Sequence, residues 1–113
     1  MFDLTNMSAH AIVDRKERID FIERTIGFGK PVVVTKRDRD INGDAVTVLT
    51  STGVVVIEVE ETREIITAFI ATVRQAQGIW HRAKGNQKMN KRLWNIVNYN
   101  NNTETYKKIC GLA

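Results

Sequence analysis

The sequence AVTVLTSTGVVVIEV, residues 45–59, decides the fold. β-branched and apolar residues fill Ala45 to Thr50 and again Gly53 to Val59, and Ser51-Thr52-Gly53 lies between them. Residues of these kinds favour extended strands, and a short glycine-containing link favours antiparallel pairing of its neighbours. The stretch therefore predicts a β-hairpin.

Strand-like segments lie on both sides of this hairpin. Pro31 opens a run from Val32 to Thr35, and Glu64 to Phe69 forms a fourth run. Asn42-Gly43-Asp44 is typical of a turn, as are residues 60–63. Because these connections are too short for parallel crossovers, we expect a four-stranded antiparallel meander.

A helix is predicted before the sheet. Ser8 is a suitable N-terminal cap, and Ile12, Ile19, Ile22 and Ile26 recur at helical spacing. Glycines at positions 27 and 29 would end this helix.

Two or three helices are predicted after the sheet. Their apolar positions are Val73, Ala76, Trp80 and Ala83 in one segment and Met89, Leu93 and Ile96 in the next. Gly85-Asn86 separates the two segments, and Thr103 could cap a short last helix through Ile109. The order predicts an α+β protein that forms a single domain over 1–113: a helix and antiparallel sheet in 8–70, then a basic helical extension in 71–113.

Composition favours one folded domain. The chain has 113 residues, of which 42% are hydrophobic and 27% charged, and both values lie in the globular range. A single cysteine cannot form an intramolecular disulfide, and the N-terminus lacks the pattern of a signal peptide. The longest apolar run, Gly53 to Ile57, is too short to span a bilayer. We therefore expect a cytoplasmic protein.

Charge divides the chain into two parts. Residues 1–70 carry nine Lys/Arg and twelve Asp/Glu, whereas residues 71–113 carry eight Lys/Arg and one acid, Glu104. This asymmetry indicates a surface that faces a polyanion, and nucleic acid, with RNA favoured, is the expected partner. An acidic protein is the other expected partner, and a merely solvated basic face is the alternative interpretation.

No metal or cofactor is expected. The soft ligands His10, His81 and Cys110 are isolated in the sequence, and they lack the spacing of a metal site. The glycines of residues 27–30 follow a helix rather than a strand, so they do not fit a phosphate-binding loop.

Candidate binding residues lie in the basic helices. They are Arg74, His81, Arg82, Lys84, Lys88, Lys91, Arg92 and Trp94. Gly78, between Arg74 and His81, would let a ligand approach closely, or it is a simple helix irregularity. Trp94 faces away from its apolar stripe, which predicts an exposed side chain able to stack on a base. Packing against the last helix is the alternative for Trp94.

The N-terminal helix carries a second set of candidates. Asp14 is placed to hold His10 across one helical turn. Arg15 lies within the apolar stripe, so it either reaches a cleft or extends from the edge of the core.

A family resemblance gives these residues roles. Ser8-Ala9-His10-Ala11, followed by Arg15 and Glu17-Arg18, resembles the start of small phage- and toxin-associated domains. Residues 53–57 and 65–69 resemble the hairpin that closes those domains. The domains resemble the barnase–EndoU–colicin–RelE group of metal-independent ribonucleases, and the resemblance covers residues 8 to 70.

The resemblance implies a helix packed on a four-stranded antiparallel sheet. It also implies catalytic roles for His10, Arg15, Arg18 and Thr67, in which a base activates a ribose hydroxyl and a cation stabilises the phosphorane. Two hypotheses result. One is a nucleic-acid-directed protein, possibly a metal-independent ribonuclease of toxin or phage type. The other is a non-catalytic phage or mobile-element accessory protein that binds nucleic acid or an acidic protein.

Overall fold

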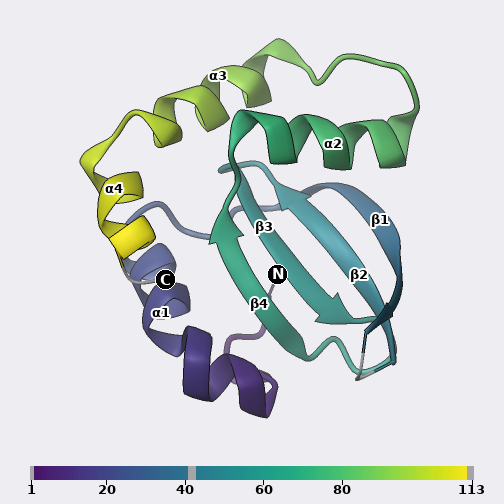
Figure 1. Ribbon diagram of the computed structural model, residues 1–113, viewed down its shortest axis with the longest axis vertical. Coiled ribbons are helices and arrows are strands. Elements are labelled where there is room, and N and C mark those ends of the chain that lie inside the picture. The colour runs from purple at the N-terminus through teal and green to yellow at the C-terminus, as the bar shows by residue number, and fades with distance from the viewer. Residues whose placement is uncertain (1, 41–42, 112–113) are drawn as a thin grey trace.

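The computed structural model describes residues 2–40 and 43–111, and its element order confirms the predicted α+β class. A π-helical turn η1 (Ala11–Arg15) leads into α1 (Lys16–Arg24). Four strands follow: β1 (Pro31–Asp40), β2 (Gly43–Thr50), β3 (Val54–Val59) and β4 (Ile65–Ile70). The chain continues through α2 (Val73–Lys84), α3 (Lys91–Asn101) and α4 (Glu104–Gly111) (Figure 1).

The four strands form one antiparallel meander in the order β1-β2-β3-β4, as predicted. The hairpin of β2 and β3 pairs Thr47 with Ile57 and Leu49 with Val55. β1 is much longer than the predicted Val32–Thr35. The expected turn at 42–44 includes Asn42, which lies outside the described residues.

Side-chain alternation along the central strand gives the sheet two buried faces. Val55, Ile57 and Val59 belong to one apolar core, and Val54 and Val56 belong to the other. We call the first face the α2 face and the second the α1 face. Because every residue of β3 is buried, both faces need a covering layer of helices.

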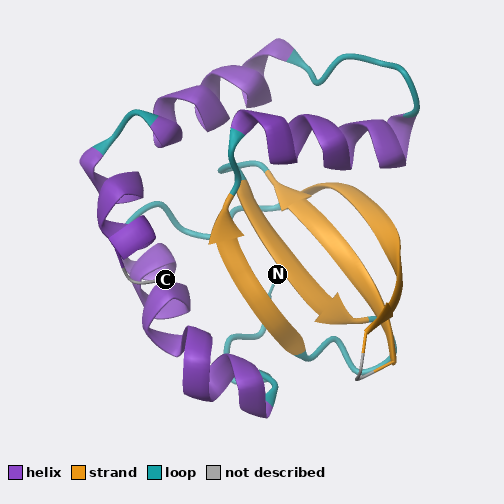
Figure 2. Ribbon diagram, in the orientation of Figure 1, coloured by secondary structure: helices purple, strands orange, loops and turns teal. Residues whose placement is uncertain are grey.

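The helices supply these two layers. Ala76, Ile79 and Trp80 of α2 pack on the α2 face together with Leu93 and Val97 of α3. On the α1 face, the corresponding contacts come from Ala11, Ile19, Ile22 and Phe28. Figure 2 shows α2 lying across one end of the sheet and α1 running beside it. The prediction that Trp80 is a core residue is confirmed, at 8% exposure.

The N-terminal helix departs from the predicted apolar stripe at Ile12. Ile19 and Ile22 are fully buried, but Ile12 is 50% exposed and Ala11 takes the buried place. The cause is the π-helical turn, because its wider repeat shifts the residues before it relative to those after it. Ser8 nevertheless caps the segment, since its Oγ accepts a hydrogen bond from the Ala11 N–H at 3.0 Å. Ile26 lies beyond the end of α1.

The helix after the strands begins at a well-defined cap. The Thr72 hydroxyl accepts the Gln75 N–H at 3.1 Å, and the Gln75 Oε1 accepts the Thr72 N–H at 2.9 Å. These reciprocal bonds form a capping box, which satisfies two N–H groups at the start of α2.

Side-chain caps also begin the two later helices, α3 and α4. Asn90 caps α3 through a 2.8 Å bond from the Leu93 N–H, and the Thr103 hydroxyl accepts the Tyr106 N–H at 3.3 Å, as its predicted capping role requires. The stripe predicted for α3 is wrong at one position. Val97 is fully buried, whereas Ile96 is only half-buried.

A close approach at Gly53 joins the hairpin to α3. Gly53 has a φ of +83°, and a Cβ placed there would lie 2.8 Å from Asn100 Nδ2 and 3.2 Å from Val97 Cγ2. The Asn100 amide cannot move away freely, because it is buried and donates to the Thr52 carbonyl at 2.7 Å. The turn therefore requires glycine for its backbone angle and for its packing.

We expect Gly53→Ala to reduce the free energy of unfolding by about 2–3 kcal/mol, because it combines positive-φ strain with a steric clash. Gly27→Ala is the matched control, since Gly27 has a φ of +73° at the end of a helix but no atom within 4 Å of an added Cβ. Urea unfolding of both variants measures the difference. Equal losses would show that α3 does not constrain the turn.

Candidate ligand-binding site

The N-terminal candidates form a local, exposed pair. His10 Nδ1 lies 2.9 Å from the Asp14 carboxylate, as the one-turn spacing predicts, and both side chains are about half exposed. Arg15 donates to the neighbouring Asp14 carbonyl at 3.2 Å. Within residues 2–40 and 43–111, no hydrogen bond or ion pair connects His10 or Arg15 with Thr67. These three residues therefore do not form a connected group.

Arg18 and Thr67 do meet, at the edge of the sheet. Arg18 donates Nη2 to the Thr67 hydroxyl and Nε to the Ala68 carbonyl, both at 2.9 Å. Further along the same edge, Ile65 exchanges 2.8 Å backbone bonds with Asn6 and Ser8. Since an unpaired strand edge leaves polar backbone groups unsatisfied, these contacts supply partners for the backbone of Ile65 and the carbonyl of Ala68 on the outer edge of β4.

The basic candidates are spread over three segments. Arg74, His81, Arg82 and Lys84 lie on α2, Lys88 on the connection, and Lys91 and Arg92 on the first turn of α3; all are exposed. His81 Nδ1 is occupied locally, 2.9 Å from the Gly85 carbonyl. Trp94 is 41% exposed, so the prediction of a partly exposed indole is confirmed.

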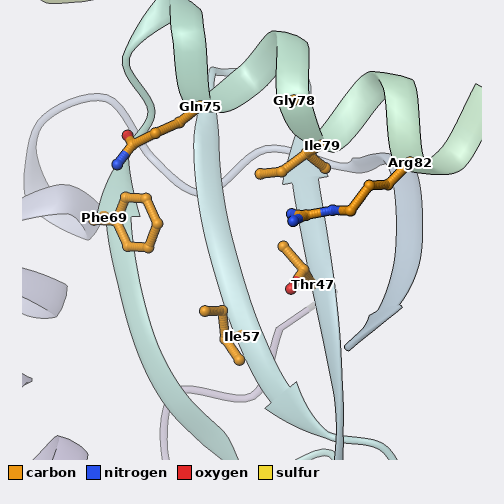
Figure 3. Close-up of a pocket in the computed structure, with 7 residues that line it drawn as sticks. All are labelled: Thr47, Ile57, Phe69, Gln75, Gly78, Ile79 and Arg82. Carbon is orange, nitrogen blue, oxygen red and sulfur yellow. The ribbon is translucent and has the colours of Figure 1, made fainter. Parts of the chain in front are cut away.

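One of these cations, Arg82, lines a cavity between α2 and the sheet. The cavity has a volume of about 360 Å³, within the usual range for small-molecule sites. Its lining consists of Thr47, Ile57, Phe69, Gln75, Gly78, Ile79 and Arg82. We call this cavity the α2 pocket (Figure 3).

The sheet supplies the floor of the α2 pocket. Thr47 of β2 and Ile57 of β3 are directly paired and nearly fully buried, and Phe69 of β4 is half-buried beside them. Ile79 of α2, 4% exposed, contributes apolar surface from the helix. A ligand in this pocket would therefore bury its apolar part against a pre-formed surface.

The polar groups of the pocket come from the two ends of α2. In Figure 3, Gln75 lies beside Phe69, whereas the Arg82 guanidinium extends over Thr47. The Gln75 Oε1 already accepts the Thr72 N–H, so the group left for a ligand is its Nε2 amide, a donor. An arginine side chain has donors only. The pocket thus presents donors at Gln75 and Arg82, with a hydroxyl at Thr47.

Arg82 has no counter-charge in the described part of the chain. No ion pair or hydrogen bond engages its guanidinium. The nearest acid after α2 in the sequence is Glu104, and none lies between Glu64 and Glu104. A guanidinium placed this way is suited to a carboxylate or phosphate, which it can bind through two parallel hydrogen bonds.

Gly78 leaves the pocket open along α2. A Cβ at this position would meet no atom within 4 Å, so the missing side chain creates accessible space rather than close packing. Of the two interpretations of Gly78, closer approach of a ligand agrees with this placement.

A second hollow, of about 540 Å³, places Lys30 and Arg92 near the cap of α3. Arg82 and Arg92 therefore line different cavities, and the basic candidates do not converge on one site. The α2 pocket differs from this second hollow because buried side chains of the sheet, Thr47 and Ile57, form its floor.

Sequence reasoning selected Arg82 and discussed Gly78 but missed Thr47, Ile57, Phe69, Gln75 and Ile79. A usable signal was present for Gln75. Thr72 and Gln75 have the spacing of a capping box, and Gln75, Gly78 and Arg82 follow at three- and four-residue intervals that place them on one helix side. The floor residues gave no comparable signal.

The residues that the structure describes hold neither a metal-binding cluster nor a membrane-spanning helix. No group of three or more His, Cys, Asp or Glu side chains among them could hold a metal ion. Nor does any helix in the described ranges have the length and apolarity needed to cross a bilayer.

Comparison with known proteins gives one family match. The family model of the biotin protein ligase C terminal domain matches residues 27–74, which run from the middle of the loop after α1 to the first turn of α2. This is less than half of the chain, and it contains the pocket floor but not Gln75 or Arg82. No curated protein and no solved structure matches the chain.

This match corrects the predicted function. A domain similar to part of a biotin protein ligase gives no support to a nucleic-acid-directed protein, a ribonuclease, or a phage or toxin protein, and that prediction is wrong. The error came from the basic composition of residues 71–113, which reports charge but not the chemistry of a ligand. The family match does not test the resemblance to metal-independent ribonucleases, which stays a prediction.

A buried carboxylate lies on the opposite, α1 face. Glu58 is 3% exposed, and its Oε1 has no hydrogen-bond partner within the described residues. Arg63 Nε is 3.7 Å away, too far for a hydrogen bond. Burial raises the pKa of Glu58 above its ordinary value, and the Arg63 charge only partly opposes this.

We expect Glu58 to reduce stability as the pH rises. Its raised folded-state pKa means that the folded protein binds the proton more tightly than the unfolded chain does. The loss of unfolding free energy that comes from ionising the buried Glu58 carboxyl is therefore absent below the unfolded-state pKa. It develops as the pH rises through the folded-state pKa.

Glu58→Gln, which cannot ionise, should gain unfolding free energy relative to the original protein at about pH 7 and lose that gain at about pH 4. Urea unfolding at the two pH values measures the change. A gain of the same size at both would exclude ionisation as its cause.

Proposed function

We propose that this protein is a binding domain for a small anionic, amphipathic molecule, which it holds in the α2 pocket. The observation that carries the proposal is the unpaired Arg82 guanidinium beside a floor of buried apolar side chains. An apolar ligand body gains from leaving water, and an anionic group gains from a charge-assisted hydrogen bond. A neutral polar ligand would use neither feature fully.

The surroundings of the pocket favour an anion over a cation. The segment from residue 71 onward has a formal charge of +7, since Glu104 is its only acid. A positive field of this kind raises the local concentration of anions and their rate of association. The field supports capture of the ligand, while Arg82 and the apolar floor supply selectivity.

Biotin is the first molecule to test. The matched family consists of domains of biotin protein ligases, and biotin has the required chemistry: a carboxylate, an aliphatic chain and a ring system with a ureido carbonyl. The match covers the strands that form the pocket floor.

Two expectations from the sequence remain predictions. One is a cytoplasmic location. The other is that the basic helices bind nucleic acid or an acidic protein.

Arg82→Ala should weaken biotin binding by about tenfold, because a hydrogen bond to a charged group contributes about 1.5–3 kcal/mol and the exposure of Arg82 favours the lower figure. Isothermal titration calorimetry measures the affinity. Arg74→Ala is the matched control, since Arg74 is an exposed, unpaired arginine of the same helix outside the pocket. The control should bind as the original protein does. Equal loss in both variants would show that general positive charge, and not the pocket, holds the ligand.

A further inference from the structure

The two donors of the α2 pocket are separated by a defined length. Gln75 and Arg82 are seven residues apart on α2. With a rise of about 1.5 Å per residue, they are roughly 10 Å apart along the helix axis. Gly78 and Ile79 lie between them and offer no polar side chain. A ligand that uses both donors must be an extended molecule with a polar group at each end.

The two ends are chemically different. Arg82 is a cation able to bind both oxygens of a carboxylate. Gln75 offers a neutral amide N–H, which suits a carbonyl oxygen. Its amide orientation is set by the cap, because the Thr72 N–H at 2.9 Å requires an acceptor and therefore the oxygen. The pocket is polar at both ends and directional.

We infer that the α2 pocket selects an extended free carboxylic acid, with the carboxylate at Arg82, the apolar chain over Gly78 and Ile79, and a carbonyl acceptor at Gln75. This inference rests on the proposed function and adds the orientation of the ligand. It has a consequence for specificity. A molecule whose carboxyl group is esterified, or joined through an amide to a protein, has lost the charge that Arg82 recognises.

The first experiment compares biotin with biotin methyl ester by isothermal titration calorimetry. The original protein should bind the acid about tenfold more tightly, since one charge-assisted contact is lost in the ester. Arg82→Ala should bind the acid and the ester equally. If the original protein binds both equally, Arg82 does not recognise the carboxylate; the orientation and the preference for an anion are then wrong, while binding of biotin in the α2 pocket stands. If neither binds, the proposed function itself is overturned.

The second experiment tests the other end with Gln75→Glu. Glutamate retains the capping box, because its carboxylate also accepts the Thr72 N–H, but it has no donor for the ligand. The variant should bind biotin about five- to tenfold more weakly. Nonanoic acid, which has a carboxylate but no acceptor at the far end, is the matched probe and should bind the variant and the original protein alike.

The nonanoic acid result separates loss of the donor from simple repulsion by the new charge. Repulsion over roughly 10 Å is largely screened at physiological salt, and it would act on both acids. Weaker binding of biotin alone supports the contact at Gln75. Equal weakening of both ligands, or of neither, overturns it.

Discussion

The burial of β3 on both faces is the constraint on which the structure depends. All six of its residues are buried, so neither face of the sheet can be left in water. One face is covered by η1 and α1, the other by α2 and α3. The floor of the α2 pocket follows from the same requirement, because Ile57 must be covered and α2, which crosses only part of the sheet, leaves a cavity beside it.

The capping box of α2 connects fold and site. Thr72 and Gln75 start the helix immediately after β4, and the bond that holds the cap also orients the Gln75 amide. From this start, the helical repeat determines where Gly78, Ile79 and Arg82 lie relative to the sheet. A local backbone requirement therefore helps to set the distance between the two donors of the pocket.

The strands and the fold class were predictable because their signals are local. The β-branched runs around the turn at Ser51 specify a hairpin whatever surrounds it, and the short connections exclude parallel pairing. Ile12 was misplaced because a π-helical turn breaks the regular repeat on which the prediction relied. The exposure of Trp94 followed from its position opposite the apolar stripe of α3.

The pocket was not predictable in the same way. Thr47 and Phe69 are far apart in the sequence, and only the strand register and the crossing of α2 bring them together. Arg82 was recognised as a cation, but its role was assigned from net charge, which does not distinguish a polyanion-binding surface from a pocket for one small anion. Arg18 and Thr67, two of the four residues that the resemblance named as catalytic, are in contact at the edge of β4, and their catalytic role stays a prediction.

A nuclear magnetic resonance titration with biotin tests the central claim, the α2 pocket as a binding site, most directly. Amide signals of Gly78, Ile79 and Phe69 should shift with a common, saturable affinity in the original protein. In Gly78→Leu the new Cβ would meet no atom within 4 Å, so the leucine side chain can extend into the open pocket, and replacing glycine by leucine stabilises a helix by about 0.5–1 kcal/mol. This folded variant should show no such shifts. Shifts that persist in Gly78→Leu, or that centre on Lys30 and Arg92 instead, would contradict the account.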